Sequence, residues 1–174
     1  TTSGAGQVFV GHSAGKGTGT ALTGTNNTAI GRDSGLVLQG NAYSNTFVGA
    51  DTGKAVTTGV QNTFMGQGAG DAFNDADNNV AIGAFALSTE TNNNGNTAVG
   101  AEALGNQNAG GGGDARNSAL GFQAGLAVTD GVYNTLIGAQ AGLSLQSVNY
   151  NTAVGAFALD ACSHGSQTTA IGYA

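Results

Sequence analysis

A nine-residue phrase recurs ten times in this chain, and one glycine marks its position in every copy. These glycines are Gly11, Gly31, Gly49, Gly66, Gly83, Gly100, Gly121, Gly138, Gly155 and Gly172. The steps between them are 20, 18, 17, 17, 17, 21, 17, 17 and 17 residues. A period this short leaves no room for a pair of helices, so each copy is predicted to form one turn of a β-solenoid.

Composition favours a regular stacked core over disorder. Val, Ile, Leu and Phe make up 34 of the 174 residues, a low share that is by itself typical of disordered chains. Disorder of that kind also needs a high charge, whereas only 8% of these residues are charged and the apolar ones recur in register. Pro is absent, and 32 Gly residues suit a backbone that bends sharply between hydrogen-bonded strands.

The charge of the chain indicates which classes of partner it can bind. The net charge is −6, and the four basic residues, Lys16, Arg32, Lys54 and Arg116, are scattered along the chain. We therefore expect no nucleic-acid partner. The sequence contains no leader or long apolar run, so we expect no membrane insertion, and the single cysteine, Cys162, excludes an internal disulfide.

The phrase can be described by slots, with slot 1 four residues before the glycine, which is slot 5. Slot 1 is Asn in eight copies and slot 2 is usually Thr. Slot 3 is apolar throughout (Phe9, Ala29, Phe47, Phe64, Ala81, Ala98, Ala119, Leu136, Ala153, Ala170). Slot 4 is always a larger aliphatic residue (Val10, Ile30, Val48, Met65, Ile82, Val99, Leu120, Ile137, Val154, Ile171). Such a segment, rich in Thr, Val and Ile and ended by Gly, is predicted to be a short strand.

Slots 3 and 4 must face opposite sides of the strand, because neighbouring side chains alternate. One column lines the coil, and the other needs a cover, since long apolar stripes mark interfaces. We expect slot 4 to fill the coil, and slot 3, including Phe47, Phe64 and Leu136, to contact identical chains around an axis.

A small residue and then Gly or Leu follow the glycine at slots 8 and 9, and a second apolar column stands at slot 12. Glu90 and Gln107 interrupt slot 12 in the copies that carry Leu87 and Leu104. We interpret each Leu as filling the space of the missing apolar residue, although Leu159 is followed by Cys162 at slot 12.

The phrase Asn-Thr-Ala-Val-Gly-Ala-Phe-Ala-Leu at 151–159, with near copies at 79–87 and 96–104, resembles the head repeats of trimeric autotransporter adhesins. It is more similar still to repeats of bacteriophage tail fibres and related bacterial fibres. The resemblance implies an all-β fold, a left-handed parallel β-roll of about ten 17-residue turns wound as a homotrimer. The apolar columns, including Ile30, Ile82, Val99, Ile137 and Val154, would then lie inside the rolls and along the threefold axis. Those adhesin heads usually have shorter repeats.

The sequence contains only weak matches to catalytic and ligand-binding motifs. Residues 11–15 spell the G-x-S-x-G of a hydrolase nucleophile elbow, but the next two copies repeat the glycine spacing without the Ser. Residues 15–18 lack the Walker A spacing, and residues 75–79 lack the glycine of a calcium loop. We expect no enzyme and no cofactor. His12, His164 and Cys162 are too few for a metal site in one chain, although a threefold axis would gather three copies of His164.

Two tyrosines, Tyr133 and Tyr150, precede slot 1 in adjacent copies. Aromatic faces suit sugar rings, so these residues are candidates for receptor binding. The alternative is that they cover the turn, and this is the better-supported interpretation.

The predicted function is structural and adhesive. We expect residues 1–174 to form a single repeat domain from a longer fibre protein, extracellular on a cell surface or virion. Its homotrimer would serve as the shaft or head of a phage tail fibre or bacterial adhesin, binding a glycan or protein receptor. The alternative is a self-assembling extracellular filament with end-to-end neighbours and no receptor site of its own. Ice binding, suggested by the Thr column, is a weaker alternative because Val8, Val80 and Ser118 interrupt it.

Overall fold

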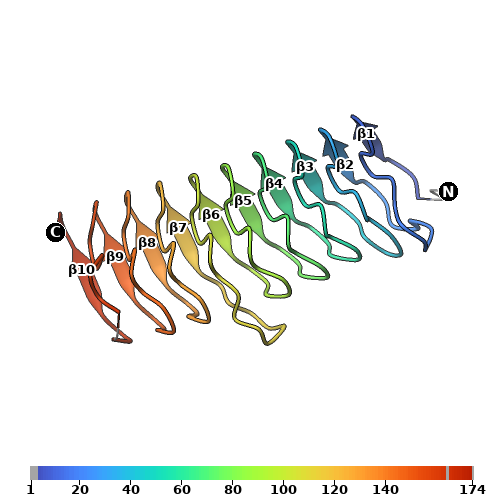
Figure 1. The fold of residues 1–174 in the computed structure, drawn as a ribbon. Helices are drawn as coiled ribbons and strands as arrows, with labels where there is room; N and C mark the ends of the chain where they lie inside the picture. The colour runs from blue at the N-terminus through green and yellow to red at the C-terminus, as the bar shows by residue number, and fades with distance from the viewer. Residues whose placement is uncertain (1–3, 164, 174) are drawn as a thin grey trace.

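The computed structural model describes residues 4–163 and 165–173, and it is a parallel β-solenoid of about ten turns (Figure 1). Its ten strands form one sheet in sequence order, and no helix occurs in the described part of the chain. The strands are β1 (Val8–Val10), β2 (Thr28–Ile30), β3 (Thr46–Val48), β4 (Thr63–Met65), β5 (Val80–Ile82), β6 (Thr97–Val99), β7 (Ser118–Leu120), β8 (Thr135–Ile137), β9 (Thr152–Val154) and β10 (Thr169–Ile171).

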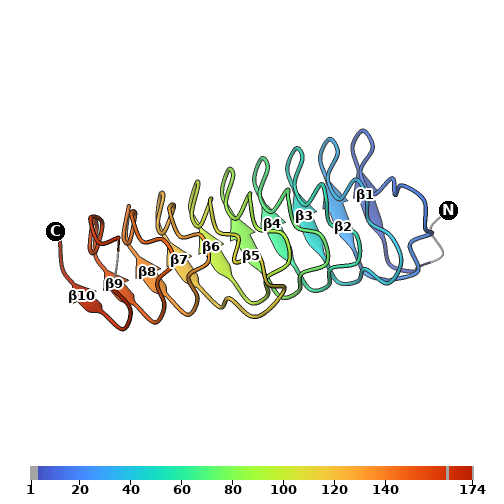
Figure 2. The ribbon, with the colours of Figure 1, turned by 60° about the horizontal axis from the view of Figure 1, so that its bottom comes forward.

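Each strand pairs with the next in strict slot register, as when Phe47 of β3 lies opposite Phe64 of β4. Identical slots therefore stack into columns along the coil, and the first and last turns lie at opposite ends of it (Figure 2). Nine steps at the strand spacing of about 4.8 Å give a sheet of roughly 43 Å. The predicted one turn per repeat is confirmed.

Two physical reasons explain why slot 5 is glycine in every copy. Its φ lies between 128° and 142° in all ten copies, a region that side chains disfavour. In addition, a Cβ at Gly66 would lie 2.6 Å from the carbonyl oxygen of Gly83, and the same clash recurs along the column. Backbones of successive turns can approach this closely only where no side chain stands between them.

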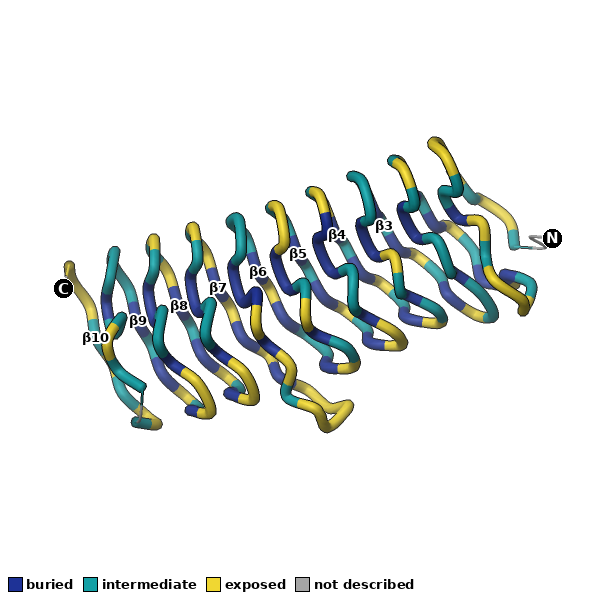
Figure 3. The backbone as a smooth tube through the Cα atoms, viewed as in Figure 1, coloured by how far each residue is buried: buried dark blue, intermediate teal, exposed yellow. Residues whose placement is uncertain are grey.

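The interior of the coil contains slots 1 and 3. Every slot 3 residue from Ala29 to Ala153 is buried, including Phe47, Phe64 and Leu136, whereas slot 4 faces outward. Buried residues recur at the same place in successive turns (Figure 3). Our assignment of the two faces was therefore wrong. The buried slot 1 Asn shares its face with slot 3, and the turn closes around both.

Slot 1 forms a buried asparagine ladder. The backbone N–H of Asn62 donates to Oδ1 of Asn45 at 3.0 Å, and its Nδ2 donates to the carbonyl of Ala76 at 2.8 Å. The pattern repeats with little change in most turns. Because each amide side chain bonds the strand below and the far side of its own turn, it satisfies polar groups that would be costly to bury unpaired.

Core volume is balanced between slots 3 and 9. A large slot 3 residue is paired with Gly at slot 9, and a Cβ at Gly70 would lie 2.5 Å from the ring of Phe64. Where slot 3 is Ala81, slot 9 is the fully buried Leu87, and the same holds for Ala98 with Leu104. Our interpretation that Leu replaces an apolar residue at slot 12 is therefore superseded. The size of the slot 3 residue determines whether slot 9 is Gly or Leu. Leu159 fits this pattern because the slot 3 residue of its turn is Ala153.

Two turns have a small residue in both slots, and their neighbours fill the space. A Cβ at Gly35 would meet Leu38 at 2.8 Å and Phe47, from the next turn, at 3.1 Å. A Cβ at Gly125 would likewise meet Leu136 of the following turn at 2.6 Å. The core is therefore packed across turns as well as within them.

Candidate functional site

The most conspicuous surface feature is the outward column of slot 4. Its members run along all ten strands, and the exposed fraction is 55% for Val10, 44% for Met65, 51% for Leu120 and 38% for Ile137. Ile30 is also exposed, and Ile82, Val99 and Val154 are of intermediate exposure. The alternation of side chains places these residues outside because slot 3 occupies the interior. A continuous apolar stripe of this length is typical of an interface.

Slot 2 flanks the stripe on the same face. Its threonines are half-buried or exposed, and Val8, Val80 and Ser118 lie in register with them. The outward face of the sheet therefore carries two parallel columns, one of hydroxyl groups and one of aliphatic side chains.

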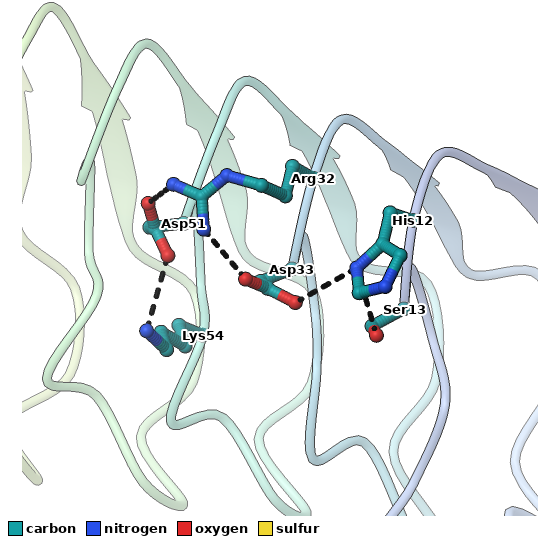
Figure 4. A network of polar contacts seen from close by, with 6 residues as sticks. All are labelled: His12, Ser13, Arg32, Asp33, Asp51 and Lys54. Atoms are coloured by element: carbon teal, nitrogen blue, oxygen red, sulfur yellow. Dashed lines mark hydrogen bonds and ion pairs between the residues drawn. The ribbon is translucent and has the colours of Figure 1, made fainter.

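A charged network lies on the bends that follow β1, β2 and β3 (Figure 4). Arg32 bonds Asp33 at 2.7 Å and also pairs with Asp51 of the next turn, and Lys54 bonds Asp51 at 3.1 Å. The Lys54 hydrogen bond, with help from Arg32, lowers the pKa of Asp51. That carboxylate therefore stabilises the fold above its unfolded pKa, and the contribution is lost as pH falls through the lowered value. Each of these ion pairs contributes little to stability, because water screens charges at the surface.

The network also includes the elbow-like motif. Ser13 Oγ lies 3.2 Å from Nδ1 of His12, and the same nitrogen lies 3.8 Å from Oδ1 of Asp33. A catalytic triad needs the two ring nitrogens to contact the nucleophile and the carboxylate separately. Here both contacts use one nitrogen of a largely exposed ring, so the arrangement is not that of a proton relay.

Tyr133 and Tyr150 stack on each other, with ring centroids 5.3 Å apart and planes 8° apart. The guanidinium of Arg116 lies over the Tyr133 ring, 5.9 Å from its centroid. Both faces of Tyr133 and one face of Tyr150 are therefore covered from within the chain. This favours the interpretation in which the tyrosines cover their turns, and it leaves one face of Tyr150, the ring edges and the hydroxyl groups for a receptor.

The remaining candidate ligand sites offer few groups that could bind a ligand. Asp77 Oδ1 accepts the backbone N–H of Val60 at 2.8 Å, so this oxygen already serves the turn. Among the described residues, no group of three His, Cys, Asp or Glu side chains could hold a metal ion. His164, the candidate for axial metal binding, lies outside the described residues. Gly15, Lys16 and Leu38 help to line a small hollow of about 180 Å³ beside the first turn.

The burial of Glu90 and Gln107 inside the coil was not predicted from the sequence. Their position at slot 12, a column that is otherwise apolar, could have indicated it. Within the described residues, no helix is long and apolar enough to span a membrane. No family model, curated protein or solved structure matches the chain.

Proposed function

We propose that the chain is a rigid fibre segment that assembles as a homotrimer through the slot 4 column. The observation that carries the proposal is the outward aliphatic stripe along all ten strands. A monomer would leave this stripe in water, and identical chains around a threefold axis cover it with the same stripe.

The apolar surface of this stripe is large enough to drive association. Fully burying one Val, Ile, Leu or Met side chain stabilises by about 1.5–3 kcal/mol; six of these side chains expose 38–77% of their surface, and the other four expose less. The ten residues together then contribute about 6–12 kcal/mol per chain, which lies within the range of about 4–15 kcal/mol that association costs. The Thr column at the flank adds hydroxyl groups that hydrogen-bond across the contact.

The resemblance to adhesin heads and tail-fibre repeats supports a proposal for the biological role of the trimer. We place the trimer, with a left-handed roll, in the shaft or head of an extracellular fibre on a cell surface or virion, where it attaches to a receptor. A filament without a receptor site is the alternative. Purified trimers that bind cells or glycans support the adhesin, whereas trimers that only grow end to end support the filament.

The experiment is a sedimentation measurement on the native chain and on Ile137→Asp. The native protein should sediment at three times the chain mass of 16.8 kDa. Ile137→Asp should sediment as a folded monomer, because the charge enters the contact but not the coil. Ala139→Asp, an exposed change in the same turn but outside the stripe, is the matched control and should remain trimeric. A monomeric native protein would exclude the proposal.

Ice binding is a second candidate, because the Thr and aliphatic columns lie side by side in register on one face. It requires that face to be open to water. A monomeric native protein that inhibits ice recrystallisation would therefore favour it over the fibre.

A further inference from the structure

Three buried polar atoms in the fifth and sixth turns lack the partners that the rest of the core has. They are Oε2 of Glu90, Nδ2 of Asn96 and Nε2 of Gln107, and none has a hydrogen-bond partner in the described part of the chain. All three residues are 0% exposed. Leaving buried polar groups unpaired destabilises a fold, so three together call for an explanation.

Glu90 is held firmly by its other oxygen. Oε1 accepts the backbone N–H groups of Thr91, Asn92 and Asn93 at 2.8–3.2 Å and Nδ2 of Asn93 at 2.9 Å. These four bonds fix the carboxylate in the interior. Oε2 takes part in none of these bonds and remains a buried acceptor without a partner.

Asn96 is the break in the asparagine ladder. In the turns below and above, Nδ2 donates to a carbonyl 14 residues ahead, as Asn79 does to Asn93 and Asn117 does to Gly131. The turn of Asn96 is four residues longer than the 17-residue period, and its extra residues form the loop that projects beyond its neighbours between β6 and β7 (Figure 1). The carbonyl is displaced with the loop, and Nδ2 keeps no acceptor.

Gln107 is linked to Asn96 through Asn117. Its Oε1 accepts a hydrogen bond from Nδ2 of Asn117 at 2.7 Å, which identifies Nε2 as the buried donor without a partner. Asn117 in turn donates its backbone N–H to Oδ1 of Asn96 at 3.1 Å, so the two amides are tied together.

Glu90 is joined to the same group of residues. Glu90 and Gln107 occupy slot 12 of successive turns, and the residues beside them, Thr91 and Asn108, bond each other at 3.2 Å. That bond lies at the surface and keeps the two slot 12 side chains in register, so the three unpaired atoms belong to a set of buried side chains in neighbouring positions of the interior.

The set comprises one acceptor and two donors. A cation would be repelled by the two amide N–H groups, and an anion by the carboxylate. A molecule that accepts two hydrogen bonds and donates one matches all three atoms, and buried water typically makes about three such bonds.

We propose that one ordered water molecule binds here as an integral part of the coil, accepting from Asn96 Nδ2 and Gln107 Nε2 and donating to Glu90 Oε2. It replaces the carbonyl that the longer turn has moved away. The long loop is thus accommodated by a solvent molecule within an otherwise regular core.

The test is a crystal structure of the native chain at a resolution that shows ordered water. Density should lie within hydrogen-bond distance, about 2.7–3.2 Å, of all three atoms. A direct bond from either amide to Glu90 Oε2 with no density between them would overturn the proposal. So would an ion with ligand distances of about 2.3–2.6 Å, which indicate calcium.

A solution measurement provides the second arm. Magnetic relaxation dispersion of water counts long-lived internal molecules, and Gln107→Met should lose one per chain because a donor is removed at nearly constant length. Gln123→Met is the matched control, since Gln123 bonds in a ladder on the outside of the coil. Equal counts in native protein and Gln107→Met would contradict the assignment.

Discussion

The balance between slots 3 and 9 can be tested by moving the pattern of one turn into another. Phe64→Ala empties a fully buried position and should cost about 3–5 kcal/mol. Gly70→Leu should also destabilise. Its Cβ would meet the Phe64 ring at 2.5 Å, and its φ is 58°. Overpacking of about 1–3 kcal/mol and left-handed strain of about 1–2 kcal/mol then add.

The double variant Phe64→Ala/Gly70→Leu recreates the natural pair of Ala81 and Leu87, in which Leu is accommodated at a φ of 49°. Its side chain should enter the space of the lost ring. Left-handed strain remains, and so does the loss of stacking on Phe47 and Phe73, whose centroids lie 5.2 and 5.1 Å from that of Phe64. We expect a net loss of about 3 kcal/mol, against about 7 kcal/mol for the sum of the single changes.

The assay is guanidinium denaturation followed by circular dichroism for both single variants and the double variant. A favourable coupling of at least about 2 kcal/mol is expected for residues in contact. Phe64→Ala combined with Gly125→Leu, three turns away, is the control and should be additive. Additive behaviour in the Phe64/Gly70 pair would refute the volume argument.

Three further outcomes follow from the same geometry. Gly138→Ala should cost at least about 3 kcal/mol by denaturant titration, because its φ is 133° and its Cβ would lie 2.5 Å from the carbonyl of Gly155; Gly113→Ala, in open space, should cost under about 0.5 kcal/mol. Burial raises the pKa of Asp71 above its unfolded value, so its ionised form destabilises the fold above the raised pKa and the penalty vanishes below the unfolded one. Asp71→Asn should therefore raise the melting temperature at pH 7 but not at pH 3, and an equal rise at both would contradict the burial effect. Deleting the exposed residues 110–113 should change stability by no more than about 1 kcal/mol in thermal melting, and collapse of the fold would show that the loop is structural.

The sequence alone determined the solenoid. The glycine period requires one short element per copy, and the φ and close contacts at slot 5 show why no other residue replaces Gly. The same pattern predicted ten strands, their columns and a second apolar stripe on the opposite face, because side chains alternate in any strand.

The sequence did not determine which stripe lies inside. Slots 3 and 4 are both apolar in every copy, so alternation separates them without orienting them. The orientation depends on the closed turn, in which the slot 1 Asn must reach carbonyls across the coil, and slot 3, two residues on, must share its face. The trade between Phe64 and Gly70 and the buried positions of Glu90 and Gln107 also arise only when the turn closes. Strand periodicity is local and is written in the sequence, whereas core volume and the pairing of buried polar atoms depend on residues that only the tertiary structure brings together.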